Sequence, residues 1–104
     1  MAKVLDCGQN TFSARTPVYG FGVGRNKVKA KSVAMDMAYA FADTLANAEG
    51  AKWKCPEDKG CPNKQGPVIA NLKTTELLTV KLQKLLYLSV VRRTFDIVIH
   101  CQGH

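Results

Sequence analysis

The feature that most constrains the fold is the segment at residues 27–50, which is rich in alanine and has neither proline nor internal glycine. Alanine is the best helix former, so this segment predicts one long α-helix. Asn26 is a suitable N-cap and Gly50 a suitable C-terminal stop. Apolar residues at helical spacing predict one buried stripe, which comprises Ala30, Ala34, Met37, Ala38, Phe41 and Leu45.

The segment before this helix, residues 11–24, predicts a strand with two unlike faces. The large side chains share one face, at Tyr19, Phe21 and Val23. Glycines share the other face, at Gly20, Gly22 and Gly24. Glycine weakens a strand and is typical of places where another backbone approaches closely. We therefore expect the alanine-rich helix to pack on the glycine face of this strand.

The second half of the chain follows a loop at residues 51–66, which proline and glycine punctuate. Alternating apolar residues favour a strand near 68–82 and another near 85–101. Together these segments predict a single α+β domain of the order β-α-β-β, with one long helix packed on an antiparallel sheet. Because no turn residue stands between the two strands, a second helix near 75–88 remains an alternative.

Bulk properties fit one small domain, since the chain has 104 residues, of which 46% are hydrophobic. The 15 basic and 8 acidic residues give a net charge of +7, which favours an anionic partner such as nucleic acid or a phosphate ligand. No stretch has the length or apolar character of a signal peptide or a membrane span. We therefore expect a cytoplasmic protein.

The four cysteines leave several possibilities open. Cys55 and Cys61 have five residues between them, which is wider than a zinc knuckle usually allows, so zinc held by these two with His100 and His104 is not favoured. A disulfide between Cys55 and Cys61 fits a short loop. Cys7 and Cys101 can pair if the first and last strands are neighbours. In a reducing cytoplasm, the simplest expectation is four free thiols, with Cys101 buried.

Two basic segments are candidates for an anion or nucleic-acid site. Arg25, Lys27, Lys29 and Lys31 stand at the start of the helix, where their charge opposes the helix dipole and a bound anion would relieve it. Lys52, Trp53 and Lys54 suit a stacked base between two phosphate contacts. The plainer alternatives are a solvated basic face and a tryptophan that closes the core. The glycine spacing does not match a dinucleotide-binding motif.

The sequence offers few signs of catalysis or of a cofactor. Its only histidines are His100 and His104, and no nucleophile elbow or metal-binding acidic motif occurs. We therefore expect a structural or interaction domain that forms homo-oligomers, through an exposed sheet edge or the apolar segment 77–91. An anion- or nucleic-acid-binding module is the first alternative, and a thiol or metal protein using the Cys55–Cys61 loop is the second.

Overall fold

The computed structural model describes residues 3–103. Its elements, in chain order, are β1 (Lys3–Val4), β2 (Gly8–Ser13), β3 (Val18–Gly24), α1 (Lys27–Gly50), β4 (Trp53–Lys54), the 3-10 helix η1 (Glu57–Lys59), β5 (Asn63–Gln83) and β6 (Leu86–Gln102).

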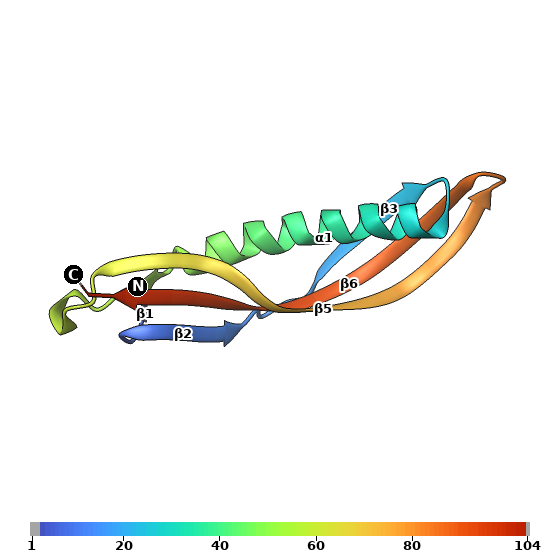
Figure 1. Cartoon of the computed structure of the whole chain (residues 1–104). Helices are drawn as coiled ribbons and strands as arrows, with labels where there is room; N and C mark the ends of the chain where they lie inside the picture. Colours follow the sequence, from blue (N-terminus) through green and yellow to red (C-terminus); the bar gives the residue numbers. More distant parts are fainter. Residues whose placement is uncertain (1–2, 104) are drawn as a thin grey trace.

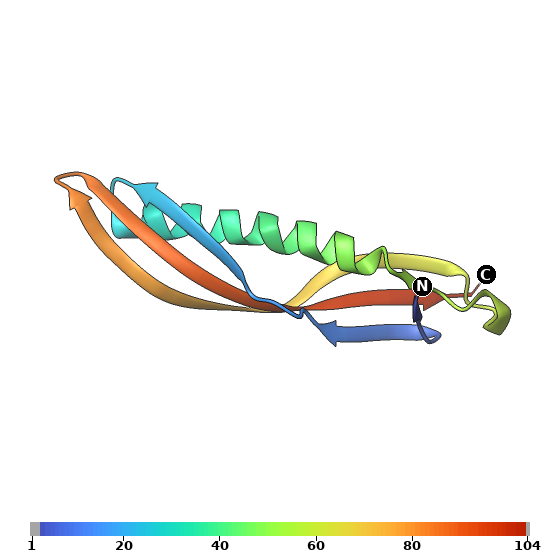
Figure 2. The same cartoon turned by 180° about the vertical axis from the view of Figure 1, so that it is seen from behind.

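The molecule is elongated, with principal extents of 62 × 24 × 16 Å. A long antiparallel hairpin of β5 and β6 runs along its length, and β6 is the central strand of the main sheet (Figure 1). On the other side of β6, β2 and β3 lie end to end, both antiparallel to it (Figure 2). The short strands β1 and β4 form a separate parallel pair. Strand β1 and the last residues of β6 lie at the end of the molecule opposite the β5–β6 turn (Figure 1).

The expected α+β domain, with one helix on an antiparallel sheet, is confirmed. The order β-α-β-β is not, because the first expected strand is split into β2 and β3. Ser13 of β2 pairs with Asp96, and Val18 of β3 pairs with Arg93. The four residues between Ser13 and Val18 therefore lie opposite only two residues of β6. The intervening residues 14–17 therefore leave the regular ladder. The alternative of a second helix near 75–88 is wrong, since these residues form the β5–β6 hairpin.

Helix α1 begins as expected, because the Asn26 side chain accepts a hydrogen bond of 2.9 Å from the Lys29 backbone nitrogen. It also ends at Gly50. The buried stripe is narrower than expected and repeats at every fourth residue, through Ala30, Ala34, Ala38, Ala42 and Ala46. Phe41 is 53% exposed, and Met37 and Leu45 are only partly buried. Helix α1 lies so close to the sheet that its fully buried positions all hold small residues.

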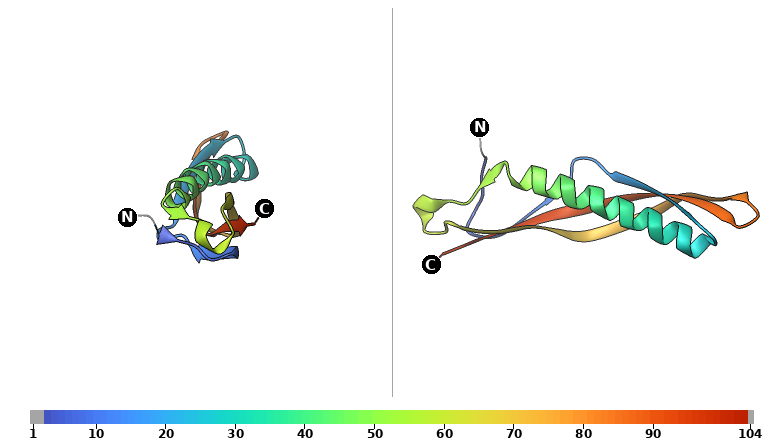
Figure 3. Two further views of the ribbon diagram at one scale, coloured as in Figure 1. Left: turned by 90° about the vertical axis from the view of Figure 1, so that its left-hand side faces the viewer. Right: turned by 90° about the horizontal axis from the view of Figure 1, so that it is seen from above.

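The expected contact between alanine and glycine is confirmed and positions α1 on β3. A β-carbon built at Gly20 would lie 2.8 Å from the Ala38 backbone nitrogen, and one at Gly24 would lie 2.7 Å from that of Ala30. Both distances are shorter than real β-carbon contacts. The helix backbone therefore rests on the strand backbone, and α1 covers one face of the sheet (Figure 3).

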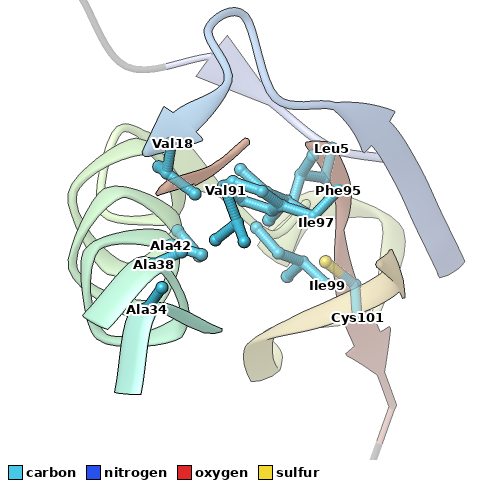
Figure 4. Packing of buried hydrophobic residues seen from close by; sticks show 11 residues of the cluster. Leu5, Val18, Ala34, Ala38, Ala42, Val91, Phe95, Ile97, Ile99 and Cys101 are labelled. Carbon is cyan, nitrogen blue, oxygen red and sulfur yellow. The ribbon is translucent and has the colours of Figure 1, made fainter. Parts of the chain in front are cut away.

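The core lies between α1 and β6. Odd-numbered residues of β6 point toward the helix, and six of them are buried: Ser89 and the apolar Val91, Phe95, Ile97, Ile99 and Cys101. The apolar ones pack with Leu5, Val18 and the helical alanines (Figure 4). Even-numbered residues of β6 point to the opposite face, which is called the outer face below. No helix in the described part of the chain is long and apolar enough to cross a membrane.

Candidate interaction surfaces

The cysteines form two disulfides, Cys7–Cys61 and Cys55–Cys101, and none is free. The expected Cys55–Cys61 disulfide, the Cys7–Cys101 alternative and the free thiols are therefore all wrong. The loop opens around η1, so that Cys55 meets the end of β6 while Cys61 meets the segment before β2. Together the two disulfides tie the loop to the N-terminal segment and to the last strand, at one end of the molecule.

A metal site at these residues is not supported. Both loop cysteines are consumed by disulfides, and His100 lies on the opposite face of β6 from the buried Cys101. Among residues 3–103, no group of three or more histidine, cysteine, aspartate or glutamate side chains is placed to hold a metal ion. His104 lies outside the described residues.

The structure does not bring the two basic segments together. Arg25 and the lysines at residues 27–31 stand at the start of α1, and residues 52–54 follow its end. A helix of 24 residues is about 36 Å long at 1.5 Å per residue, so the two segments are about that far apart. They do not form one continuous anion-binding surface, and anion binding at either segment remains a prediction.

Several of these residues already have protein partners. The Lys52 ammonium lies 3.3 Å from the Glu49 carboxylate. The Trp53 ring lies 4.9 Å from that of Phe12, centroid to centroid, and packs against the core. The Trp53 carbonyl accepts a hydrogen bond of 2.9 Å from Lys64. This placement agrees with the alternative in which the tryptophan closes the core at the helix end.

The two adjacent arginines of β6 point to opposite faces, as their parity required. Arg93 points toward the helix, where its guanidinium donates a hydrogen bond of 3.2 Å to the Met35 carbonyl. Arg92 is exposed on the outer face, in one row with Tyr19 of β3 and Thr75 of β5. The next two rows toward the β5–β6 turn contain no charge.

These two rows form the core of an apolar outer face. In register across three strands, Phe21 lies beside Val90 and then Leu78, and the following row is Val23, Leu88 and Val80. We call these six residues, together with Tyr19, the apolar outer face. Three further exposed leucines, at positions 77, 82 and 85, lie in the same hairpin next to these rows.

The exposed area of this region is large for so small a protein. Eight of its side chains are between 42% and 74% exposed: Tyr19, Phe21, Val23, Leu77, Leu78, Val80, Leu82 and Leu85. Whole side chains of these types present roughly 150–250 Å², so the eight together expose on the order of 700 Å². The largest apolar patch on a typical monomer is about 300–600 Å².

The apolar segment 77–91 was expected to be an interaction surface, but its continuation onto β3 was not. The signal for that continuation is the alternation of residues 19–24. Since glycine faces the helix, the three large side chains must point to the outer face. Their neighbours on that face depend on the pairing of β3 with β6, which the sequence does not reveal.

The hollows of the structure are small or open. The best-formed one has a volume of about 220 Å³ and lies beside the end of α1, between Phe12, Arg15, Lys52 and Trp53. It is smaller than the roughly 300–1,000 Å³ typical of sites for drug-sized ligands. The broad apolar outer face is therefore the stronger candidate for a functional surface.

Comparison with known proteins gives no further guide to function. No protein-family model, no curated protein and no solved structure matches this chain.

Proposed function

We propose that this protein is a structural domain, rather than an enzyme, and that it associates with copies of itself through the apolar outer face. The observation that carries the proposal is the pair of uncharged rows that cross β3, β6 and β5 on the outer face. An apolar area on the order of 700 Å² is close to the roughly 800 Å² that each partner buries in a standard protein interface.

A second copy is a suitable occupant because it presents an equally apolar face. Two such faces related by a twofold axis can stack as two sheets do, about 10 Å apart, with side chains of both layers interdigitating. Arg92 stands at one border of the apolar rows, where it remains in contact with solvent. An interface with an apolar centre and a polar rim is the usual arrangement.

The two disulfides favour an oxidising compartment for this activity over the cytoplasmic location that the sequence suggested. Disulfides persist in secreted and periplasmic proteins and are rare in a reducing cytoplasm. We include this location in the proposal.

Sedimentation equilibrium over a wide concentration range tests the proposal. The natural chain is expected to exceed the monomer mass, and the double variant Leu78→Lys/Val80→Lys is expected to lose the association that the outer face supports. Val68→Lys is the matched control, because Val68 is 52% exposed on the outer face of the same strand but outside the apolar rows. A natural chain that stays monomeric at every concentration would refute the proposal.

A further inference from the structure

The two edges of the sheet are protected to very different degrees. The edge strand β5 has four register shifts against β6, contains Pro67, and carries charges at Lys73 and Lys81. Bulges, proline and charge are the usual means by which an edge strand avoids pairing with another chain. The edge of β5 is therefore built against such pairing.

The opposite edge, at β3, has none of these protections. Its sequence VYGFGVG has no charge and no proline, and all seven residues pair with β6 in unbroken register. Among the described strands, β3 pairs only with β6, so its other side presents free backbone donors and acceptors. A regular, uncharged edge strand is a template for another strand.

An apolar ridge on α1 lies along the helix side of this edge. Val33, Met37 and Phe41 recur at every fourth residue, and Val33 and Phe41 are 46% and 53% exposed. The ridge lies toward β3, since a β-carbon at Gly22 would lie 2.7 Å from that of Val33. The opposite flank of the helix lies toward β5, because Lys31 pairs with Glu76 there.

A second apolar ridge follows the outer side of the same edge. It is formed by the alternate residues of β3 that point away from the helix, Tyr19, Phe21 and Val23, which are between 44% and 57% exposed. The free edge of β3 thus lies between two apolar ridges (the near edge in Figure 2). A strand that pairs here would bury apolar side chains above and below its backbone.

We infer that a second copy of this chain pairs its own β3 antiparallel to this one, about a twofold axis. The two sheets would join into one, and the two α1 helices would lie side by side on the same face. Twofold pairing makes each ridge contact its own counterpart, as an isologous interface requires.

The charges of α1 fit this antiparallel arrangement. Its first turns carry Lys27, Lys29 and Lys31 and no acidic residue, whereas Asp43 and Glu49 stand in its second half. Between antiparallel helices, the basic half of each lies opposite the acidic half of the other, and the two helix dipoles oppose one another favourably. Lys31 takes no part in this contact, because it lies on the flank toward β5 and already pairs with Glu76.

The area is sufficient for a stable contact. The five exposed side chains of the two ridges together present on the order of 500 Å², against roughly 800 Å² per partner in a standard interface. Pairing would also bury the free backbone edge of β3, which this sum leaves out.

This edge interface is separate from the stacking of outer faces. It rests on the proposed function only in that both involve association of copies of the same chain. Edge pairing alone yields a dimer, and stacking of two such dimers yields a four-chain assembly with three mutually perpendicular twofold axes. Variants can therefore remove one interface and leave the other.

The first test is sedimentation of the double variant Val33→Lys/Phe41→Lys, with its helix content checked by circular dichroism. It is expected to weaken the edge dimer at least about tenfold, because charge replaces two central apolar contacts. Val28→Lys is the matched control, since Val28 is 78% exposed on the flank of α1 away from β3 and should leave the mass unchanged. An unchanged mass for the double variant would overturn the inference.

The second test is amide hydrogen exchange of β3 in the natural chain and in the outer-face variant Leu78→Lys/Val80→Lys. The amides of β3 that point to the free edge should exchange more slowly as concentration rises, in both proteins. Exchange that is fast and independent of concentration would refute edge pairing even if the chain associates. A protein that shows slow β3 exchange but no effect of Leu78→Lys/Val80→Lys on its mass would instead refute the outer-face proposal alone.

Discussion

The two ends of this molecule are held together by different means, although the same two long strands run through both. The base, residues 3–13, 51–70 and 96–102, contains both disulfides and the Phe12–Trp53 contact. The tip, residues 18–40 and 73–93, contains no disulfide and relies on the contact of glycine with alanine. Covalent closure secures the base, and close backbone packing secures the tip.

The outer faces of the two ends differ in the same way. Along β6 the outward residues change from Leu88 and Val90 at the tip to Asp96, Val98 and His100 at the base, where only Val98 is apolar and is itself buried. The base is stabilised within one chain and presents a polar outer surface. The tip leaves apolar side chains exposed that only another molecule can cover, which is why both proposed interfaces lie there.

The largest expected effect is the loss of the disulfides from the base. The cysteines of Cys55–Cys101 and Cys7–Cys61 are 46 and 54 residues apart, and loop-closure entropy then gives about 4 kcal/mol for each. Replacing Cys55 and Cys101 by alanine should lower the free energy of unfolding in urea by about that amount. In hydrogen exchange, amides of β2 should lose more protection than those of β3. Equal loss in both strands would contradict the view that the disulfides stabilise mainly the base.

The corresponding change at the tip is Gly22→Ala. The new methyl group would meet the Ala30 carbonyl and the Ala34 nitrogen, which belong to the helix backbone and cannot rotate away. Overpacking of this kind costs about 1–3 kcal/mol, so a clear fall in the urea midpoint is expected. Val68→Ala, at a half-exposed position of β5 outside both proposed interfaces, is the control and should cost less than about 1 kcal/mol.

This difference also explains which parts of the fold the sequence could predict. The helix, its N-cap at Asn26 and its contact with the glycine strand follow from local patterns of period 3.6 and 2, so they were predicted. The break between β2 and β3 depends on the register in which each pairs with β6, and no local sequence pattern predicts that register. The hairpin turn after Gln83 lacks the usual turn residues, so the helix alternative there could not be dismissed.

The candidate surfaces divide in the same way. The segment 77–91 was recognised because its apolar residues adjoin in sequence. The disulfide pairing was not, because four cysteines allow three connectivities and only the tertiary fold selects one. The basic residues at the start of α1 and those of the Lys52–Lys54 segment lie far apart, because the whole length of the helix separates them.

A smaller effect is expected for Asp96→Ala in the base. The Asp96 carboxylate accepts hydrogen bonds from the Ser13 hydroxyl at 3.1 Å and from the Asn71 amide at 2.8 Å, and so links β2 and β5 across β6. Loss of these bonds, at a partly exposed site, should cost about 1–2 kcal/mol in urea unfolding. The exposed Asp58→Ala is the control, and a cost no greater than that of the control would show that the base depends on its disulfides alone.

The smallest effect is expected for Glu76→Gln at the tip. The Glu76 carboxylate lies 4.0 Å from the Lys31 ammonium, and both side chains are 45% exposed. Exposed ion pairs of this kind contribute about 0–1 kcal/mol, and glutamine keeps an oxygen to accept the 2.8 Å hydrogen bond from Thr79. Unfolding in urea at low and high salt should therefore shift by less than about 0.5 kcal/mol.

The matched change beside the base is Glu49→Gln, which removes the charge of the pair that Glu49 makes with Lys52 of the base at 3.3 Å. Both variants should lose equally little free energy of unfolding, because water screens both ion pairs. Neither pair is part of the disulfides of the base or of the glycine–alanine packing of the tip. A larger, salt-dependent loss for Glu76→Gln alone would mean that charge holds α1 against β5. The tip would then be stabilised by electrostatics as well as by its glycine–alanine packing, and the contrast with the disulfide-linked base would be weaker than we argue.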